Sequence, residues 1–160
     1  MKEIKLSQNK VALVDDEDFE YLNQFKWYAL KKSNTYYAVR NIRLANGKQT
    51  SIRMHRVILN VPKGMETDHK NQNGLDNQRE NLRICTRQEN AMNGSSHKDS
   101  SSKFKGVSWY DRKWHSQIEY KGVSKHLGGF LLENEAALSY NKKAIELFGE
   151  FAKLNNEILH

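Results

Sequence analysis

The sequence predicts an α+β fold in two small units. Three observations support this fold: short strand-like runs separated by turn residues in both halves of the chain, one clear helical pattern near the C-terminus, and a polar segment between the halves. That segment, GSSHKDSSSK (94–103), has no apolar residue and is typical of a flexible linker. We therefore expect a first unit over residues 1–93, with a β-rich part over 1–52 and a strand–strand–helix motif over about 53–93, and a second unit over 104–160.

The β-rich part begins with VALV (11–14), which is predicted to be a short strand, and continues with the acidic run DDEDFEYLNQF, a turn or brief helix. Two longer strand-like runs, TYYAVRNIRL and KQTSIRMHRVIL, flank the pair Asn46-Gly47. An Asn-Gly pair between two strands is a strong signal for a β-hairpin. The end of the second run, MHRVILNV, is expected to become helical before Pro62, the only proline of the chain.

An asparagine-rich run, ETDHKNQNGLDNQRENLRICTRQEN (66–90), contains one Asp-His pair. Asparagine favours turns because its side chain bonds to nearby backbone, and a turn-forming role is the simplest interpretation of several of these residues. On a strand, Asp68 and His69 would point to opposite faces, so the chain has to turn here if both act at one site. The residues interpreted as turn formers are Asn71, Asn73 and Asn77.

The rest of this run is predicted to form a second strand and the start of a helix. LRIC (82–85) is predicted to be a returning strand, and Thr86 with Glu89 matches a capping box at the start of a helix that contains Asn90. A carboxylate can bind a hard divalent cation, and an imidazole is a base with a pKa near neutrality. A lone Asp-His pair is usually a solvated turn, so chemistry here depends on the whole ordered set of residues.

Residues 53–93 resemble the ββα-metal motif of HNH homing endonucleases of the phage and intron type, through the pieces MHR, DHKNQNGLDN, ENLR and QEN in that order. The resemblance implies that Asp68 and Asn90 hold one divalent cation, that His69 is the general base, and that Asn81 orients the imidazole. Because Asn90 stands where many HNH enzymes have a final histidine, the protein ligands are all oxygens. Oxygen ligands favour Mg²⁺ or Mn²⁺ over zinc.

Two basic residues and a histidine lie at the start of this segment. Arg53 and Arg56 are candidate DNA contacts. His55 lies between them and is interpreted as a packing or phosphate-contacting residue with no chemical role.

The second unit is predicted to be a three-stranded antiparallel sheet packed on one helix. FKGVSWY, KWHSQIEY and SKHLGGF are separated by the short pairs Asp111-Arg112 and Lys121-Gly122, as in consecutive hairpins. ENEAALSYNKKAIELFGE has the pattern of a helix that stops at Gly149. Its apolar face is formed by Ala137, Tyr140, Ala144 and Phe148.

Residues 104–155 resemble the Apetala/ethylene-response-factor DNA-binding domain, which implies that the sheet rather than the helix contacts double-stranded DNA. The charges agree, since residues 104–129 carry a net charge of +3 and residues 130–160 one of −2. An alternative interpretation makes Trp114 a core aromatic residue. The candidate DNA contacts are Trp109, Arg112, Lys113, Trp114, Lys121 and Lys125.

Composition limits the location and the partners that the protein can have. No apolar stretch is long enough to cross a membrane, and the single Cys85 allows no internal disulfide, so we expect an intracellular protein, in the host cytoplasm if phage-encoded. The net charge of +7 suits a polyanionic partner, and no obligatory protein partner is evident. We predict a metal-dependent DNA endonuclease. The alternatives are a DNA-binding regulator with an unused nuclease motif and an RNA-binding module, although no RNA-reading pattern is present.

Overall fold

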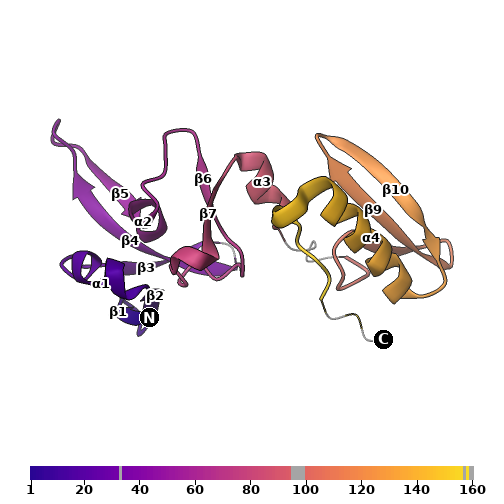
Figure 1. Cartoon of the computed structure of the whole chain (residues 1–160), viewed down its shortest axis with the longest axis horizontal. Helices are drawn as coiled ribbons and strands as arrows, with labels where there is room; N and C mark the ends of the chain where they lie inside the picture. The colour runs from indigo at the N-terminus through magenta and orange to yellow at the C-terminus, as the bar shows by residue number, and fades with distance from the viewer. Residues whose placement is uncertain (33, 95–99, 157, 159–160) are drawn as a thin grey trace. The chain divides into compact units, whose positions relative to one another are not determined.

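The computed structural model describes residues 1–32, 34–94, 100–156 and 158. The chain divides into two compact units, Met1–Asn90 and Ala91–His160. Each unit contains both strands and helices, and the strands of the described residues form small antiparallel sheets (Figure 1). The predicted α+β fold class is confirmed at this level.

The N-terminal unit opens with a hairpin of two short strands. β1 (Lys2–Lys5) pairs antiparallel with β2 (Val11–Val14), and α1 (Asp16–Leu22) follows. Strand β2 and the acidic helix match the sequence expectations, whereas β1 was not expected. Its sequence, KEIK, has one apolar residue, Ile4, which is buried while the flanking side chains are exposed.

A three-stranded sheet forms the centre of this unit. Its strand order is β3-β4-β5, with β3 at Tyr28–Lys32, β4 at Thr35–Arg43 and β5 at Gln49–Arg53. The predicted hairpin at Asn46-Gly47 is confirmed, because β4 and β5 pair antiparallel around it. Asn46 Oδ1 accepts a hydrogen bond from the Lys48 amide at 3.1 Å, and Gly47 has a φ of 78°, a conformation that glycine adopts without strain.

The strand–strand–helix segment shares a core with this sheet. After α2 (Met54–Ile58), β6 (Glu66–His69) pairs antiparallel with β7 (Leu82–Cys85); η1 (Arg79–Asn81) precedes β7 and α3 (Arg87–Met92) follows it. Because Leu82 packs in the same core as the first hairpin, the segment is fixed to the β-rich part of the unit. The core consists of Ile4, Ala12, Val14, Leu22, Trp27, Ala38, Met54, Ile58 and Leu82.

The predicted capping box at the start of α3 is confirmed. Glu89 Oε2 accepts a hydrogen bond from the Thr86 amide at 2.7 Å, and Thr86 Oγ1 accepts one from the Glu89 amide at 3.2 Å. These reciprocal bonds satisfy two backbone donors that a short helix would otherwise expose. Helix α3 therefore starts at a defined residue, and that start sets the position of Asn90 relative to β7.

The C-terminal unit is a sheet with the strand order β10-β9-β8, covered on one face by α4 (Glu133–Phe148) (Figure 1). The strands are β8 (Val107–Tyr110), β9 (Lys113–Tyr120) and β10 (Val123–Phe130), joined by two-residue turns as expected. Gly149, with a φ of 52°, ends the helix.

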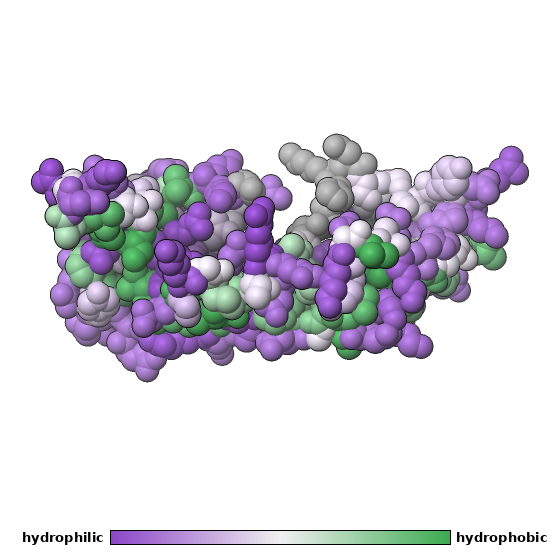
Figure 2. Space-filling view, turned by 90° about the horizontal axis from the view of Figure 1, so that it is seen from above, coloured by the Kyte–Doolittle hydropathy of each residue, from purple (hydrophilic) through white to green (hydrophobic). Residues whose placement is uncertain are grey.

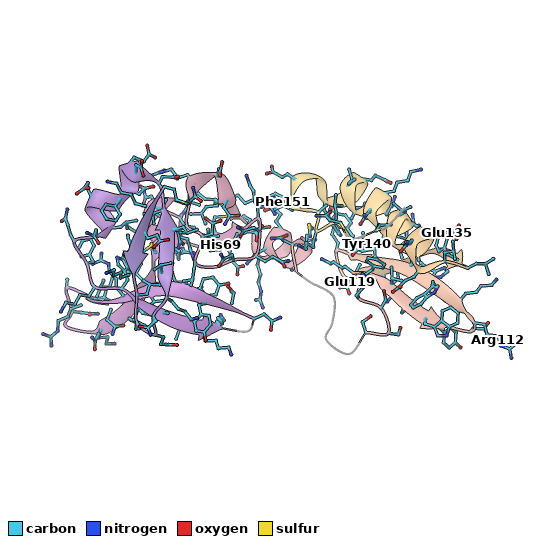
Figure 3. The ribbon with its side chains drawn as sticks, turned by 90° about the horizontal axis from the view of Figure 1, so that it is seen from below. His69, Arg112, Glu119, Glu135, Tyr140 and Phe151 are labelled. Atoms are coloured by element: carbon cyan, nitrogen blue, oxygen red, sulfur yellow. The ribbon has the colours of Figure 1, made fainter. Side chains whose placement is uncertain are left out.

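Tyr140 of α4 fills the space between the helix and the sheet (Figure 3). Its ring lies so close to Gly106 that a Cβ atom there would meet it at 2.1 Å. Glycine at position 106, with a φ of 73°, is thus needed both for the backbone conformation and for space.

The linker predicted over 94–103 is too long at its C-terminal end; residues 95–99 lie outside the described residues. Ser102 is buried, and its hydroxyl donates to Glu133 Oε1 at 2.6 Å. Ser101 Oγ accepts a hydrogen bond from the Trp109 amide at 2.8 Å. A polar serine run reads as a linker, but serine hydroxyls can also bind to a folded unit, and here they do.

The partly buried Lys105 is expected to make the stability of the fold depend on pH. Its ammonium donates to the Met92 carbonyl at 2.6 Å, and burial, with a smaller effect of Lys153, lowers its pKa to about 8. In an unfolded chain the pKa of lysine is about 10.4. Above about pH 8 the unfolded chain therefore binds more protons than the folded one, so the stability of the fold rises with pH.

We expect the thermal midpoint of the wild type to rise between pH 7.5 and pH 9.5 relative to that of Lys105→Met, measured by circular dichroism. Above about pH 10 the midpoints of both proteins should fall, because burial raises the pKa of Tyr140 to about 12 while an unfolded tyrosine ionises near 10. Parallel pH profiles for the two proteins would contradict this role of Lys105.

Hydrophilic side chains cover most of the face drawn in Figure 2, as a chain with 28% charged residues and a mean hydropathy of −0.85 predicts. None of the helices in the described part of the chain is long and apolar enough to cross a membrane.

Candidate active site

Asp68 lies in the middle of β6, directly opposite Arg83 of β7. Arg83 Nε and Nη2 donate to Asp68 Oδ2 at 2.8 and 2.5 Å. Both side chains are nearly buried, with exposed fractions of 6% for Asp68 and 10% for Arg83. A buried carboxylate needs such a partner, because its desolvation would otherwise be very costly. The sequence pattern did not single out Arg83, which lies in a run interpreted only as a returning strand.

His69 is the last residue of β6 and lies within the N-terminal unit, with 5% of its surface exposed (Figure 3). Its ring packs edge-on against His55, with ring centroids 4.9 Å apart, and lies 5.9 Å from the ring of Tyr37. The ring centroids of Tyr37 and His55 are 5.6 Å apart. His55 is thus a buried residue that packs beside the candidate base. This agrees with its interpretation as a packing residue rather than as a phosphate contact.

Burial sets the charge state of both histidines. It lowers the pKa of His55 to about 2, and it also lowers the pKa of His69. For His69 the shift is opposed by hydrogen bonding from Asn77 and by the negative charges of Asp68 and Asp76. A neutral imidazole can accept a proton, and an acceptor beside the ring stabilises the imidazolium that results.

Asn77 is the asparagine whose side chain acts on the pKa of His69. Asn77 is fully buried; its Nδ2 donates to the Leu75 carbonyl at 3.1 Å, and its side chain acts to raise the pKa of His69. Asn81 Oδ1 instead accepts from the Asn71 amide at 3.0 Å, and its Nδ2 donates to the Asp76 carbonyl at 2.8 Å. Both ends of the Asn81 amide thus bond to the loop, and its expected role on the imidazole stays a prediction. Asn81 fixes the backbone of the loop that follows His69.

The asparagine-rich loop is built from local turns, as expected for Asn71 and Asn73. Asn71 Oδ1 accepts from the Asn73 amide at 2.9 Å, and Asn73 Oδ1 accepts from the Leu75 amide at 3.1 Å. Asn71 Nδ2 also donates to Asp76 Oδ2 at 2.7 Å. Asparagine side chains are suited to these bonds because they mimic a backbone turn.

The same loop is fastened to the β-rich part of the unit by bonds to β2, to Thr35 and to the acidic helix. The Gly74 amide donates to Thr35 Oγ1 at 3.0 Å, and a Cβ at Gly74 would lie 2.5 Å from the Tyr36 carbonyl oxygen, so only glycine fits. Another of these points lies on the acidic helix, for which the sequence suggested no role. There Arg79 makes a bidentate bond to Asp18 at 2.7 and 2.8 Å, and its amide donates to Asp15 at 2.7 Å.

Asn90 is linked back to β6 through Glu66. Its Nδ2 donates to Glu66 Oε2 at 2.6 Å. Glu66 and Asp68 are two residues apart on one strand, so they share a face, and His69 points to the other face. The structure thus places Asn90 on the Asp68 side of β6. His69 lies on the opposite side, at the point where the strand ends.

The donors on the Asp68 face suit a hard divalent cation. Mg²⁺ is usually held by one or two carboxylates together with waters and substrate phosphates, and amide oxygens are compatible ligands. Asp68 and Asn90 supply atoms of this kind, and a carboxylate that binds an arginine retains lone pairs for a further partner. Within the described residues no three His, Cys, Asp or Glu side chains are grouped as metal ligands.

The two predicted DNA contacts before the motif differ in their surroundings. The Arg53 guanidinium stacks on Tyr37 at 5.3 Å from the ring centroid, on the side of the sheet where His69 lies. Arg56 Nη1 donates to the Met65 carbonyl at 2.9 Å and so fixes the loop that leads into β6. Arg56 thus has a structural partner, whereas Arg53 stacks on the tyrosine whose ring also lies near His69.

In the C-terminal unit, strand register separates the predicted DNA contacts by face. Trp114 packs against the core under α4, so it is the core aromatic of the alternative interpretation, and Trp109 lies directly opposite it on the same face. Lys125 pairs with the buried Ile118 and also lies on the helix side, where its charge acts on Glu146. Three of the six expected contacts are therefore not on the uncovered face of the sheet.

The uncovered face, which we call the outer face, carries Lys113 and a set of hydrogen-bonding side chains. His115 Nδ1 lies 3.0 Å from His126 Nε2 across β9 and β10. Arg112 and Lys121 lie in the two turns that border this face, and Figure 3 shows Arg112 at the tip of its hairpin. The outer-face residues, given by alternation and register, are Ser108, Tyr110, Lys113, His115, Gln117, Glu119, Ser124 and His126.

Comparison with known proteins adds independent information. Residues 60–92 match a family model described as HNH endonuclease. An uncharacterized HNH endonuclease of Acanthamoeba polyphaga mimivirus is 30% identical over 151 residues, which cover 90% of this chain and 74% of that protein. Protein 3.8 of Escherichia phage T7 is 30% identical over 95 residues, which cover 58% of this chain and 78% of that protein. No solved structure matches.

Proposed function

The chain belongs to the HNH endonuclease family, and we propose that it hydrolyses phosphodiester bonds of double-stranded DNA in a metal-dependent reaction of the homing-endonuclease type. One observation carries the proposal. Asp68 and His69 end β6 in front of a rigid loop, and the helix after β7 returns Asn90 to the Asp68 face of the same strand. The residues matched by the family model include all of these groups.

His69 is the general base in this proposal. Its neutral ring takes a proton from the water whose oxygen attacks phosphorus, and Asn77 stabilises the imidazolium that forms. Asp68 and Asn90 would hold Mg²⁺ or Mn²⁺. When bound, the cation supplies stabilisation of the charge on the phosphate and on the departing oxygen. A base buried in the free protein is compatible with this role, since catalytic hydrogen bonds often form only in the substrate complex.

A plasmid cleavage assay tests the proposal. We expect the purified protein to cut supercoiled DNA in the presence of Mg²⁺ or Mn²⁺, to lose this activity in EDTA, and to regain it when the metal is restored. Binding of the same DNA without any cleavage under these conditions would contradict a nuclease and support a DNA-binding regulator with an unused motif.

The C-terminal sheet is the proposed DNA-binding unit, with the outer face toward the DNA. Lys113 supplies positive charge on this face, and Arg112 and Lys121 supply it at the borders, while the polar side chains between them can bond to bases or phosphates. The covered face is filled by α4, so the outer face is the side on which a duplex can approach.

Two lysines on opposite faces of this sheet give a matched test. We expect Lys113→Gln to weaken DNA binding and to reduce the slope of log K against log salt by about 0.9, the value for one lost phosphate contact. Lys125→Gln removes the same charge from the helix side and should leave the slope unchanged. Fluorescence anisotropy at several salt concentrations measures both. Equal effects of the two substitutions would contradict a DNA contact confined to the outer face.

A further inference from the structure

The hydrogen bond between Asn90 and Glu66 defines which end of the Asn90 amide is available. Asn90 Nδ2 donates to Glu66 Oε2 at 2.6 Å, and both residues belong to the N-terminal unit. An asparagine side chain has one oxygen and one nitrogen of nearly equal size, and only the oxygen can bind a cation. A carboxylate accepts hydrogen bonds and does not donate them. Glu66 therefore holds the nitrogen end and leaves the oxygen end pointing away from itself.

The position of Glu66 on the strand makes this orientation useful. Glu66 is the first residue of β6 and lies on the same face as Asp68, two residues further along. Asn90 comes from α3, whose first turn is fixed by the capping box and by a bond from the Asn90 amide to the Thr86 carbonyl at 3.0 Å. The helix fixes the backbone of Asn90, and among the side-chain bonds of the described residues the bond to Glu66 selects the rotation of its amide.

We propose that Glu66 is a positioning residue for the metal site, which orients the Asn90 amide so that its oxygen is presented on the Asp68 face of β6. The inference rests on the proposed function, because it presupposes that Asn90 binds a divalent cation. Glu66 acts through Asn90 and does not itself bind the cation. Substituting a partner that orients a metal ligand in this way typically lowers metal affinity or activity about 10–100-fold.

Two substitutions separate positioning from direct binding. Glutamine at position 66 keeps an oxygen that can accept from Asn90 Nδ2 but has no charge, whereas alanine removes the acceptor. We expect Glu66→Ala to lower the affinity for Mn²⁺ about 10–100-fold, and Glu66→Gln to remain close to the wild type. Electron paramagnetic resonance of free Mn²⁺, titrated into the whole protein without DNA, gives the affinity. Plasmid cleavage at limiting Mn²⁺ should follow the same order.

Glu80→Ala is the matched control, because it removes a carboxylate from an exposed position of the same unit, beside the same loop. It should bind Mn²⁺ like the wild type, and circular dichroism should show all variants folded. Equal losses in Glu66→Gln and Glu66→Ala would overturn the proposal and make Glu66 a direct ligand. An unchanged affinity in Glu66→Ala would overturn it as well. If the wild type bound no Mn²⁺ and cut no DNA, the proposed function itself would fail together with this inference.

Discussion

Replacing His69 with alanine is expected to lower the rate of DNA cleavage by a factor of about 10²–10⁴, the usual contribution of a general base. The proton of the attacking water then has no neutral imidazole to accept it, while the groups on the Asp68 face are unchanged. DNA binding should be retained, because the proposed DNA contacts of the C-terminal unit do not involve this ring. Single-turnover cleavage of a labelled duplex and anisotropy measurements on the same duplex give the two quantities separately.

His126→Ala provides the control for this experiment. His126 lies on the outer face of the C-terminal sheet, so its loss can affect binding but should not reduce the single-turnover rate at saturating protein. Because His69 packs against His55 and Tyr37, circular dichroism must show that His69→Ala remains folded. Full cleavage by a folded His69→Ala protein would rule out His69 as the base.

Replacing Arg83 with alanine is expected to destabilise the N-terminal unit by roughly 3 kcal/mol, as removal of one partner from a buried ion pair does in other proteins. Arg83 and Asp68 lie opposite each other on β7 and β6, and both are nearly buried. Without the guanidinium, the Asp68 carboxylate remains in a poorly solvated position. Urea unfolding of the whole chain, followed by far-UV circular dichroism, gives the change in free energy.

Two further variants define the cause of that loss. Asp68→Asn combined with Arg83→Ala removes the charge that Arg83 compensates, so the double variant should recover part of the stability that the single variant loses. Lys143→Ala breaks the pair with Glu146, whose carboxylate side chain is 62% exposed, and should cost much less stability than Arg83→Ala because solvent screens an exposed pair. Similar losses for the buried and the exposed pair would contradict this account of Arg83.

Local signals in the sequence predicted much of the fold. The Asn46-Gly47 hairpin and the Thr86–Glu89 capping box each depend on residues close together in the chain, and both are present. Strands β1 and β3 were not expected. The sequence of β1, KEIK, shows too little apolar alternation, and YALKK of β3 ends in two exposed lysines. Both strands are stabilised by pairing with a neighbour, which a short window of sequence does not reveal.

The site was predicted less completely than the fold, for a physical reason. The residue types were visible, but the partner of each side chain depends on strand register and loop shape. Arg83 meets Asp68 only because β6 and β7 pair with that register. Asn77, interpreted as a turn former, faces His69 only because the loop folds back on β2. Alternation along β6 could have indicated Glu66, since it lies two residues before Asp68.

Bonds join the asparagine-rich loop to residues near the start of the chain. Because of them, we do not expect the catalytic segment to keep its structure when it is transferred to another protein by itself. Residues 60–92 hold every proposed catalytic group, yet Arg79 bonds to an aspartate 64 residues earlier and Gly74 to Thr35. A chimera that transplanted only 60–92 onto another DNA-binding protein would carry the chemistry without the scaffold that shapes it. A cassette that begins at β1 and ends after α3 keeps both, and is the smallest piece we would graft.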